Sequence, residues 1–167
     1  MVLSTKLIFI LTTTSTGLIA GLLYAYSCSV NLGLNRLEDS AYLSAMQHIN
    51  KAILNPFFFF TFMGSALFLP ICTFLQYQKP FTSCFNLLLA ATLIYLVGVL
   101  GVTLFGNVPL NDALANFDIS RASMDEIKMQ RAQFEPAWNN FHFYRTLAAV
   151  CSFVLVILAL VFDTKLK

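Results

Sequence analysis

The chain has 167 residues, of which 58% are hydrophobic and only 11% are charged, and its formal net charge is +2. Soluble domains carry about 25% charged residues, so this composition excludes an ordinary soluble protein. The small net charge, without any basic run, also argues against nucleic acid as a partner. No internal repeat or Pro/Gly/Ser-rich linker divides the sequence, so we expect a single domain over residues 1–167.

Four apolar segments run through the sequence, at about residues 7–30, 53–77, 82–105 and 143–162. A helix of about 20 apolar residues crosses the ~30 Å hydrocarbon core of a bilayer. In lipid, backbone hydrogen bonds are satisfied only within helices or closed barrels. The predicted fold is therefore all-α, an integral membrane antiparallel four-helix bundle with four spans in the lipid bilayer.

The first span carries two glycines four residues apart, Gly17 and Gly21. In a helix they lie on one face, and small residues at that spacing let a second helix approach closely. We expect another helix of the same chain to pack there. The alternative is a dimer face, which would make the protein a homo-oligomer.

The connection between the first two spans has a helical pattern of its own. Its apolar residues recur at spacings of three and four: Leu43, Met46, Ile49 and Ile53. This spacing predicts an amphipathic helix, which Asp39 or Ser40 can cap. Pro56 predicts a kink where that helix enters the second span.

The connection between the third and fourth spans is also predicted to be structured. Val108-Pro109 disfavours continued helix, so the third helix is expected to stop there. Ser123 and Glu126 form a capping box, which predicts the start of the last helix. That helix is expected to bend at Pro136 and to continue into the fourth span. The bundle thus has helical extensions beyond one membrane face.

Lysines identify the side on which the termini lie. An even number of spans places both termini on one side, and the positive-inside rule makes the side rich in Lys and Arg cytoplasmic. The shortest segments carry lysines at positions 6, 79, 165 and 167, whereas the long connections mix basic residues with seven of the eight acids. Both termini and the turn at residues 76–80 are therefore predicted to be cytoplasmic.

Polar and aromatic side chains gather at the opposite ends of the spans. They are Tyr24, Tyr26, Gln47, His48, Asn50, Asn55, Asn107, Asn111, Asp112, Trp138, Asn139, Asn140, His142, Tyr144 and Arg145. Four helix ends supply them, so they can converge on one pocket. The sequence therefore predicts a polar pocket at the outer membrane face.

Arg145 is the most informative of these residues, because a guanidinium at the start of an apolar span is costly without acceptors. We expect it to bond Asn107, Asn111 or the carbonyls that Pro109 leaves free. The alternative is that Arg145 is an interfacial anchor that extends its charge into water.

Two histidines, His48 and His142, invite a metal or haem proposal because imidazole is a common ligand. They lie on separate segments, however, and two ligands do not define a closed transition-metal site. We predict no metal and no other cofactor. No catalytic-triad spacing, phosphate-binding loop or dinucleotide fingerprint supports a hydrolase, kinase or dehydrogenase.

Three blocks of the sequence resemble the anthrone-oxygenase family of small four-helix membrane proteins. They are residues 45–52 with Asn55-Pro56, residues 95–103 with Asn107-Val-Pro-Leu-Asn111, and Trp138 with Arg145-Thr146. The Asn-Val-Pro-Leu-Asn block is the most specific. The family tends to carry Trp-Asn-His-Val before the arginine, where this chain has residues 141–144 as Phe-His-Phe-Tyr.

The resemblance implies oxygenation of an anthrone-type polycyclic phenol to a quinone, by a cofactor-independent monooxygenase. The substrate has an acidic C–H between two rings, and its carbanion can pass an electron to O₂. Such a site needs a base, donors for the oxyanion and an apolar slot. The implied base is His142 or His48; the donors are Arg145, Asn107 and Asn111; the ring platform is Trp138 and Phe141; and Tyr24, Gln47, Asn50 and Asn55 complete the lining.

Two other functions use the same sequence features. A non-catalytic binder would hold a lipid, quinone or pigment in the same pocket. A structural or assembly subunit would instead present the exposed phenylalanines at positions 57–60 to another membrane protein. Catalysis, binding and assembly therefore remain open at the level of sequence.

The predicted topology is testable by labelling in sealed cells. In a cysteine-free background, Lys79→Cys should react with an impermeant maleimide only after the membrane is opened, because the turn at 76–80 faces the cytoplasm. A cysteine at position 118, in a long connection, should react from outside. Labelling of position 79 in intact cells would reverse the topology.

Overall fold

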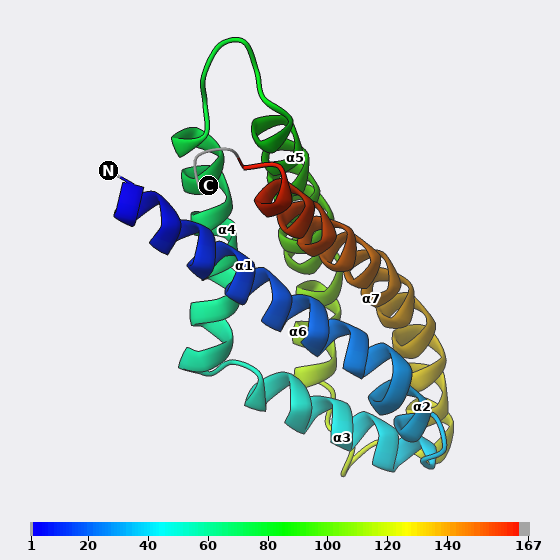
Figure 1. Cartoon of the computed structure of the whole chain (residues 1–167). Helices are drawn as coiled ribbons and strands as arrows, with labels where there is room; N and C mark the ends of the chain where they lie inside the picture. The colour runs from blue at the N-terminus through cyan, green and yellow to red at the C-terminus, as the bar shows by residue number, and fades with distance from the viewer. Residues whose placement is uncertain (1, 164–167) are drawn as a thin grey trace.

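The computed structural model describes residues 2–163, and every regular element among them is helical (Figure 1). The elements in chain order are α1 (Val2–Ala25), η1 (Tyr26–Val30), α2 (Asn31–Leu34), α3 (Asp39–Ala52), α4 (Pro56–Leu75), α5 (Ser83–Ile94), η2 (Tyr95–Gly101), η3 (Thr103–Asn107), α6 (Val108–Ala115) and α7 (Met124–Val161). The three η segments are π-helical turns that continue the neighbouring α-helices rather than interrupting them.

Four continuous helical stretches are long and apolar enough to cross a membrane. They are Thr5–Leu34, Pro56–Leu75, Ser83–Ala115 and Met124–Val161. Successive stretches run in opposite directions, so α1 begins and α7 ends at the same end of the bundle (Figure 1). The predicted all-α membrane bundle with four spans is confirmed.

The core of the bundle lies between α1, α4, α5 and α7. Hydroxyl groups join the helices there: Tyr95 donates to the Phe62 carbonyl at 2.9 Å, and Ser152 donates to the Ala91 carbonyl at 2.9 Å. Lipid offers no water to compete for these groups, so the bonds help to hold the helices in register.

Beyond the spans, α3 lies across the end of the bundle opposite the two chain ends (Figure 1). Its buried residues Tyr42, Leu43 and Met46 form a second core with Leu114, Ile127, Phe134 and Trp138. α7 has 38 residues, about 57 Å at 1.5 Å per residue. This length exceeds the ~30 Å hydrocarbon core, so helices extend beyond one face as predicted.

Arg131 fastens α3 to α7 at this end. Its guanidinium donates to Asp39 at 2.9 Å and to Glu135 at 2.7 Å, and lies 4.4 Å from the centre of the Tyr42 ring. Burial, reinforced by Glu135, raises the pKa of the Tyr42 hydroxyl. Tyr42 therefore remains a neutral phenol, and the two carboxylates balance the arginine.

Pro56 begins a helix rather than kinking one. α3 stops at Ala52, and α4 starts at Pro56 after Asn55, whose side chain accepts from the Phe58 amide at 3.1 Å. Proline is well suited to the first turn, because its missing N–H would have no helical partner there. The expected continuous, kinked helix is thus two helices.

Pro109 does not end the third helix. The π-helical turn η3 precedes it and places Pro109 in the first turn of α6, where a missing N–H costs nothing. The helix therefore continues to Ala115, about two turns beyond the expected stop. The capping box of Ser123 and Glu126 is confirmed, and α7 is continuous across Pro136.

Glycines allow the close approach of α7 at Gly17, Gly98 and Gly106. A Cβ at Gly17 would lie 2.9 Å from the Phe153 ring of α7, and a Cβ at Gly98 would lie 2.6 Å from the Ala148 Cβ. A Cβ at Gly21 would meet nothing within 4 Å. Gly17 therefore serves packing within the chain, whereas Gly21 is outside that contact.

Gly98→Ala should destabilise the bundle, because the methyl group would collide with Ala148, whose Cβ cannot move without the α7 backbone. We expect a loss of about 1–3 kcal/mol, measured by unfolding in mixed micelles. Gly21→Ala is the matched control and should be neutral or slightly stabilising, because alanine favours helix and the space is open. Equal stability of the two variants would contradict this packing.

Candidate functional site

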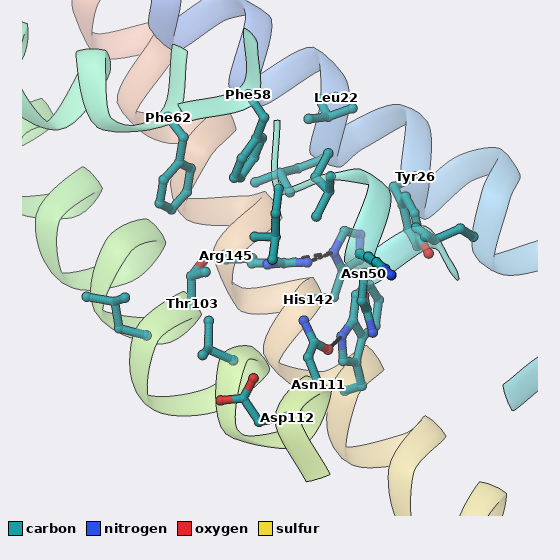
Figure 2. Close-up of a pocket in the computed structure, with 18 of the residues that line it drawn as sticks. Leu22, Tyr26, Asn50, Phe58, Phe62, Thr103, Asn111, Asp112, His142 and Arg145 are labelled. Carbon is teal, nitrogen blue, oxygen red and sulfur yellow. Dashed lines mark hydrogen bonds between the residues drawn. The ribbon is translucent and has the colours of Figure 1, made fainter. Parts of the chain in front are cut away.

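A cavity of about 610 Å³ lies where α1, α4, η3, α6 and α7 meet beneath α3 (Figure 2). This volume is within the range of about 300–1,000 Å³ typical of small-molecule sites. Most of its lining is apolar. The polar and charged lining residues are Tyr26, Gln47, His48, Asn50, Lys51, Thr103, Asn111, Asp112, Trp138, His142 and Arg145.

One face of α6 forms a wall of the cavity. Val108, Asn111, Asp112 and Ala115 all line it. Their spacing of three and four residues places them in one stripe along the helix. The Trp138 indole of α7 donates to Asn111 Oδ1 at 2.9 Å, and this bond fixes the rotation of α6 about its axis.

The cavity has both an apolar and a polar rim. The lining residues Phe59, Met63 and Leu104 are 45–48% exposed, on surfaces that face lipid in a membrane-spanning bundle. His48 and Asp112 are also exposed, at the end of the bundle beyond the spans. A ligand with an apolar body and a polar edge matches both rims.

A chain of hydrogen bonds crosses the base of the cavity. Arg145 Nε and Nη2 lie 3.3 and 3.1 Å from His142 Nδ1, which accepts because a guanidinium only donates. His142 Nε2 lies 2.9 Å from Ser27 Oγ, and Ser27 donates to the Leu23 carbonyl at 3.1 Å. The imidazole is therefore neutral, with its hydrogen on Nε2.

Aromatic rings hold this histidine in place. The His142 ring stacks on Trp138 with centroids 5.0 Å apart and an interplanar angle of 12°. Tyr26 packs against both rings, with centroids 5.4 Å from Trp138 and 5.3 Å from His142. The Arg145 guanidinium lies 5.1 Å from the centre of the Trp138 ring. His142 and Trp138 together fix the direction of Arg145.

Arg145 carries a charge that no protein carboxylate balances. Within residues 2–163, the arginines in ion pairs are Arg121 and Arg131, and Arg145 is absent from those pairs. Its hydrogen-bond acceptor there is the neutral His142. A cation in this position is costly unless a ligand supplies an acceptor.

Two further polar groups in the cavity lack partners. Thr103 Oγ1 and Asn50 Nδ2 are both buried and make no hydrogen bond in the described part of the chain. Buried polar groups are normally hydrogen-bonded. Two such groups without partners, in the cavity that the Arg145 guanidinium also lines, indicate a place where ligand or water binds.

The structure brings to the cavity seven of the residues that were given a role in the predicted site: Gln47, His48, Asn50, Asn111, Trp138, His142 and Arg145. Gln47 also donates to the Leu114 and Phe117 carbonyls at 2.8 and 2.9 Å. This pair of bonds joins α3 to the end of α6. Both long connections therefore contribute to the site, as convergence of the helix ends requires.

Four other predicted residues lie away from the cavity lining. Tyr24 is exposed, and Asn55 caps α4. Asn107 is buried and donates to the Trp138 carbonyl at 3.2 Å, and Phe141 packs over Gly106. Arg145 bonds His142 in place of the expected Asn107 or Asn111: the Asn111 Oδ1 acceptor is taken by the Trp138 indole, and Asn107 donates to the Trp138 carbonyl while its own Oδ1 has no partner among the described residues. Asn55, Asn107 and Phe141 therefore make structural contacts outside the cavity lining.

Thr103 lines the cavity and Ser27 bonds His142, and neither was predicted from the sequence. Both belong to π-helical turns, which change the facing of side chains in a way that no sequence period reveals. Tyr26, which was among the side chains expected to converge, also lines the cavity. Asp112, which was among the side chains expected to converge, lines the cavity from α6. Phe58 and Phe62 are on the inner face of α4, opposite α6. These phenylalanines contribute to the apolar lining of the cavity.

Among residues 2–163, no group of three or more His, Cys, Asp or Glu side chains is placed to hold a metal ion. His48 and His142 both line the cavity, but His142 already uses both ring nitrogens. His48 Nδ1 donates to the Ser44 carbonyl at 2.7 Å. The prediction that the protein binds no metal stays a prediction.

The fold and the cavity define a small four-helix membrane protein with a largely apolar cavity between its helices. The family model for anthrone oxygenase matches residues 57–155, which is more than half of the chain. The chain therefore belongs to the anthrone oxygenase family and is a membrane oxygenase-like protein. The matched segment contains Thr103, Asp112, Trp138, His142 and Arg145. No curated protein and no solved structure matches the chain.

Arg145→Met should leave the ligand-free protein as stable as wild type, or more stable, because an unbalanced charge is replaced by an apolar chain of similar length. Such replacements of charged groups are often neutral or stabilising by about 1–4 kcal/mol. Arg131→Met is the matched control and should lose about 2 kcal/mol or more, because it leaves Asp39 and Glu135 without their donor. Thermal unfolding in detergent compares the two. Equal losses would show that Arg145 is structural.

Proposed function

We propose that this protein is a membrane-embedded oxygenase that uses O₂ to oxidise a small lipophilic aromatic compound of the anthrone type. The site is the cavity, which we place at the outer membrane face with both termini cytoplasmic. The observation that carries the proposal is the guanidinium of Arg145, directed into an apolar cavity without a carboxylate partner in the described residues. Membership of the family supports the reaction class.

The cavity suits a flat polycyclic substrate. Phe58 and Phe62 offer an apolar wall on α4 (Figure 2). Trp138 offers an aromatic surface on α7. Rings between these walls would remove apolar surface from water, worth about 25 cal/mol per Å². The exposed Phe59, Met63 and Leu104 form a rim through which such a molecule enters from lipid. The substrate is thus proposed to approach within the bilayer.

The substrate oxygen is proposed to lie at Arg145. Loss of a proton from the carbon between the rings moves negative charge to the carbonyl oxygen, and a fixed cation stabilises that charge more strongly than the neutral ketone. Thr103 Oγ1 and Asn50 Nδ2 are additional free donors. Stabilisation that grows as the proton leaves is the kind that raises kcat.

His142 is proposed to position Arg145 rather than to take the substrate proton. Its Nδ1 accepts from Arg145, and its Nε2 hydrogen is directed at Ser27. A base needs a free lone pair within reach of the proton it removes. His142 would have to release Arg145 to gain one, and the oxyanion would then lose its fixed donor.

The reaction as proposed needs no cofactor, because the substrate carbanion itself passes the electron to O₂. A non-catalytic binder of a quinone or pigment would use the same walls and the same arginine. Oxygen consumption separates the two functions, since a binder retains the ligand and consumes none. An assembly partner on the exposed phenylalanines 57, 59 and 60 would be compatible with either function.

Purified protein supplied with anthrone should consume one O₂ for each quinone formed. Arg145→Met should lower kcat/KM by about 10-fold or more, the value of one or more hydrogen bonds to a charged group. Arg121→Met, an exposed arginine in the loop before α7, is the matched control and should behave as wild type.

Two results would count against the proposal. Binding of anthrone without any consumption of O₂ would identify a binder. Turnover that is the same in Arg145→Met and Arg121→Met would remove the arginine from the site and leave the reaction without its proposed oxyanion donor.

A further inference from the structure

We infer that Asp112 is the group that takes the proton from the substrate. This inference rests on the proposed oxygenase function and assigns the base that the reaction requires. Asp112 is part of the cavity wall, and it is not one of the proposed donors to the substrate oxygen. The argument depends on placement, on the absence of competing contacts, and on charge.

Placement comes from the helical stripe of α6. Asp112 lies between Val108 and Ala115 on the face that lines the cavity, next to Asn111. The bond from Trp138 to Asn111 holds that face toward α7. Figure 2 shows Asp112 below Asn111 and Thr103, and Arg145 higher in the same view. A substrate between the walls would have one edge at Arg145 and another at Asp112.

The carboxylate of Asp112 is free to accept a proton. Across residues 2–163 it makes no hydrogen bond and no ion pair, in contrast to Asp39, which pairs with Arg131. It is also the single carboxylate among the residues that line the cavity. The other acidic side chains at this end of the bundle lie outside the lining.

The other titratable groups of the lining are less suited. His142 has both nitrogens engaged, and Arg145 and Lys51 are cations. His48 keeps Nε2 free, because its Nδ1 hydrogen goes to the Ser44 carbonyl. It projects from α3, however, and not from the wall that Trp138 holds in place. His48 is therefore the rival that the experiment must separate from Asp112.

Charge favours a division of roles across the cavity. The carboxylate becomes neutral when it takes the proton, and the negative charge passes to the substrate oxygen, which is proposed to lie next to Arg145. An aspartate base opposite a separate set of oxyanion donors is an established arrangement for removing a proton next to a conjugated carbonyl. Because Asp112 is exposed at the polar rim, the proton that it has taken can exchange with water when no O₂ is present.

The steps balance as follows for anthrone. Asp112 takes one of the two hydrogens on the carbon between the rings, and the C–H electron pair delocalises to the carbonyl oxygen. The enolate gives one electron to O₂, and the carbon radical joins the superoxide. Asp112 returns its proton to the resulting peroxide. Loss of water, with the second hydrogen, forms the second carbonyl, so that one anthrone and one O₂ yield one quinone and one water.

The first of these steps can be measured without oxygen. In D₂O under argon, the wild type should exchange the methylene hydrogens of anthrone for deuterium faster than buffer alone, followed by NMR. Asp112→Asn should reduce the protein-catalysed exchange by about 100-fold or more, the usual contribution of a positioned base. Asp112→Glu should restore part of it. Asp125→Asn, an exposed acid outside the cavity, is the matched control and should exchange as wild type.

The outcomes separate this assignment from the proposed function. Exchange retained in Asp112→Asn, with binding of anthrone intact, would overturn the role of Asp112, and loss in His48→Gln would then assign the base to His48. A wild type that catalyses exchange but consumes no O₂ in air would contradict the oxygenase and leave Asp112 as the base. A wild type without either activity would remove both proposals.

Discussion

The site depends on one interaction, the bond from the Arg145 guanidinium to the Nδ1 atom of a neutral histidine. An arginine in an apolar cavity is normally paired with a carboxylate, which would cancel its charge and satisfy its donors. Here His142 orients the guanidinium and leaves the charge available. Ser27 fixes the histidine tautomer, and Trp138 and Tyr26 fix its plane. Much of the surrounding structure can be understood as support for this one bond.

The helical extensions beyond the membrane contribute to that support. α3 covers the cavity, and it is held by Arg131 at one point and by Gln47 at another. These polar contacts add to the apolar packing of Tyr42, Leu43 and Met46 against Leu114, Phe134 and Trp138. The cavity is therefore closed by an element outside the spans. The apolar rim of the cavity lies between α4 and η3, within the membrane-spanning part of the bundle, where its exposed side chains face lipid.

Much of the fold could be predicted from the sequence, because lipid imposes strong rules on composition and length. The four spans, the amphipathic helix containing Leu43 and Met46, and the capping box of Ser123 follow from local patterns. The convergence of Trp138, His142 and Arg145 followed from their position at one helix end. The partner of Arg145 could not be predicted. The sequence offers two asparagines in plausible positions, and it cannot show that both bond Trp138 while Arg145 bonds His142. The π-helical turns, which bring Ser27 and Thr103 to the site, have no sequence period of their own.

The central claim is that the cavity binds an aromatic molecule against Trp138 with its oxygen at Arg145. Trp138 is the single tryptophan of the chain, so its fluorescence reports on the cavity alone. Titration of the purified protein with anthrone under argon should quench this fluorescence to saturation at one molecule per chain. The affinity should fall by about 10-fold or more in Arg145→Met. Fluorescence that does not respond to anthrone, or an affinity unchanged without the guanidinium, would contradict the account.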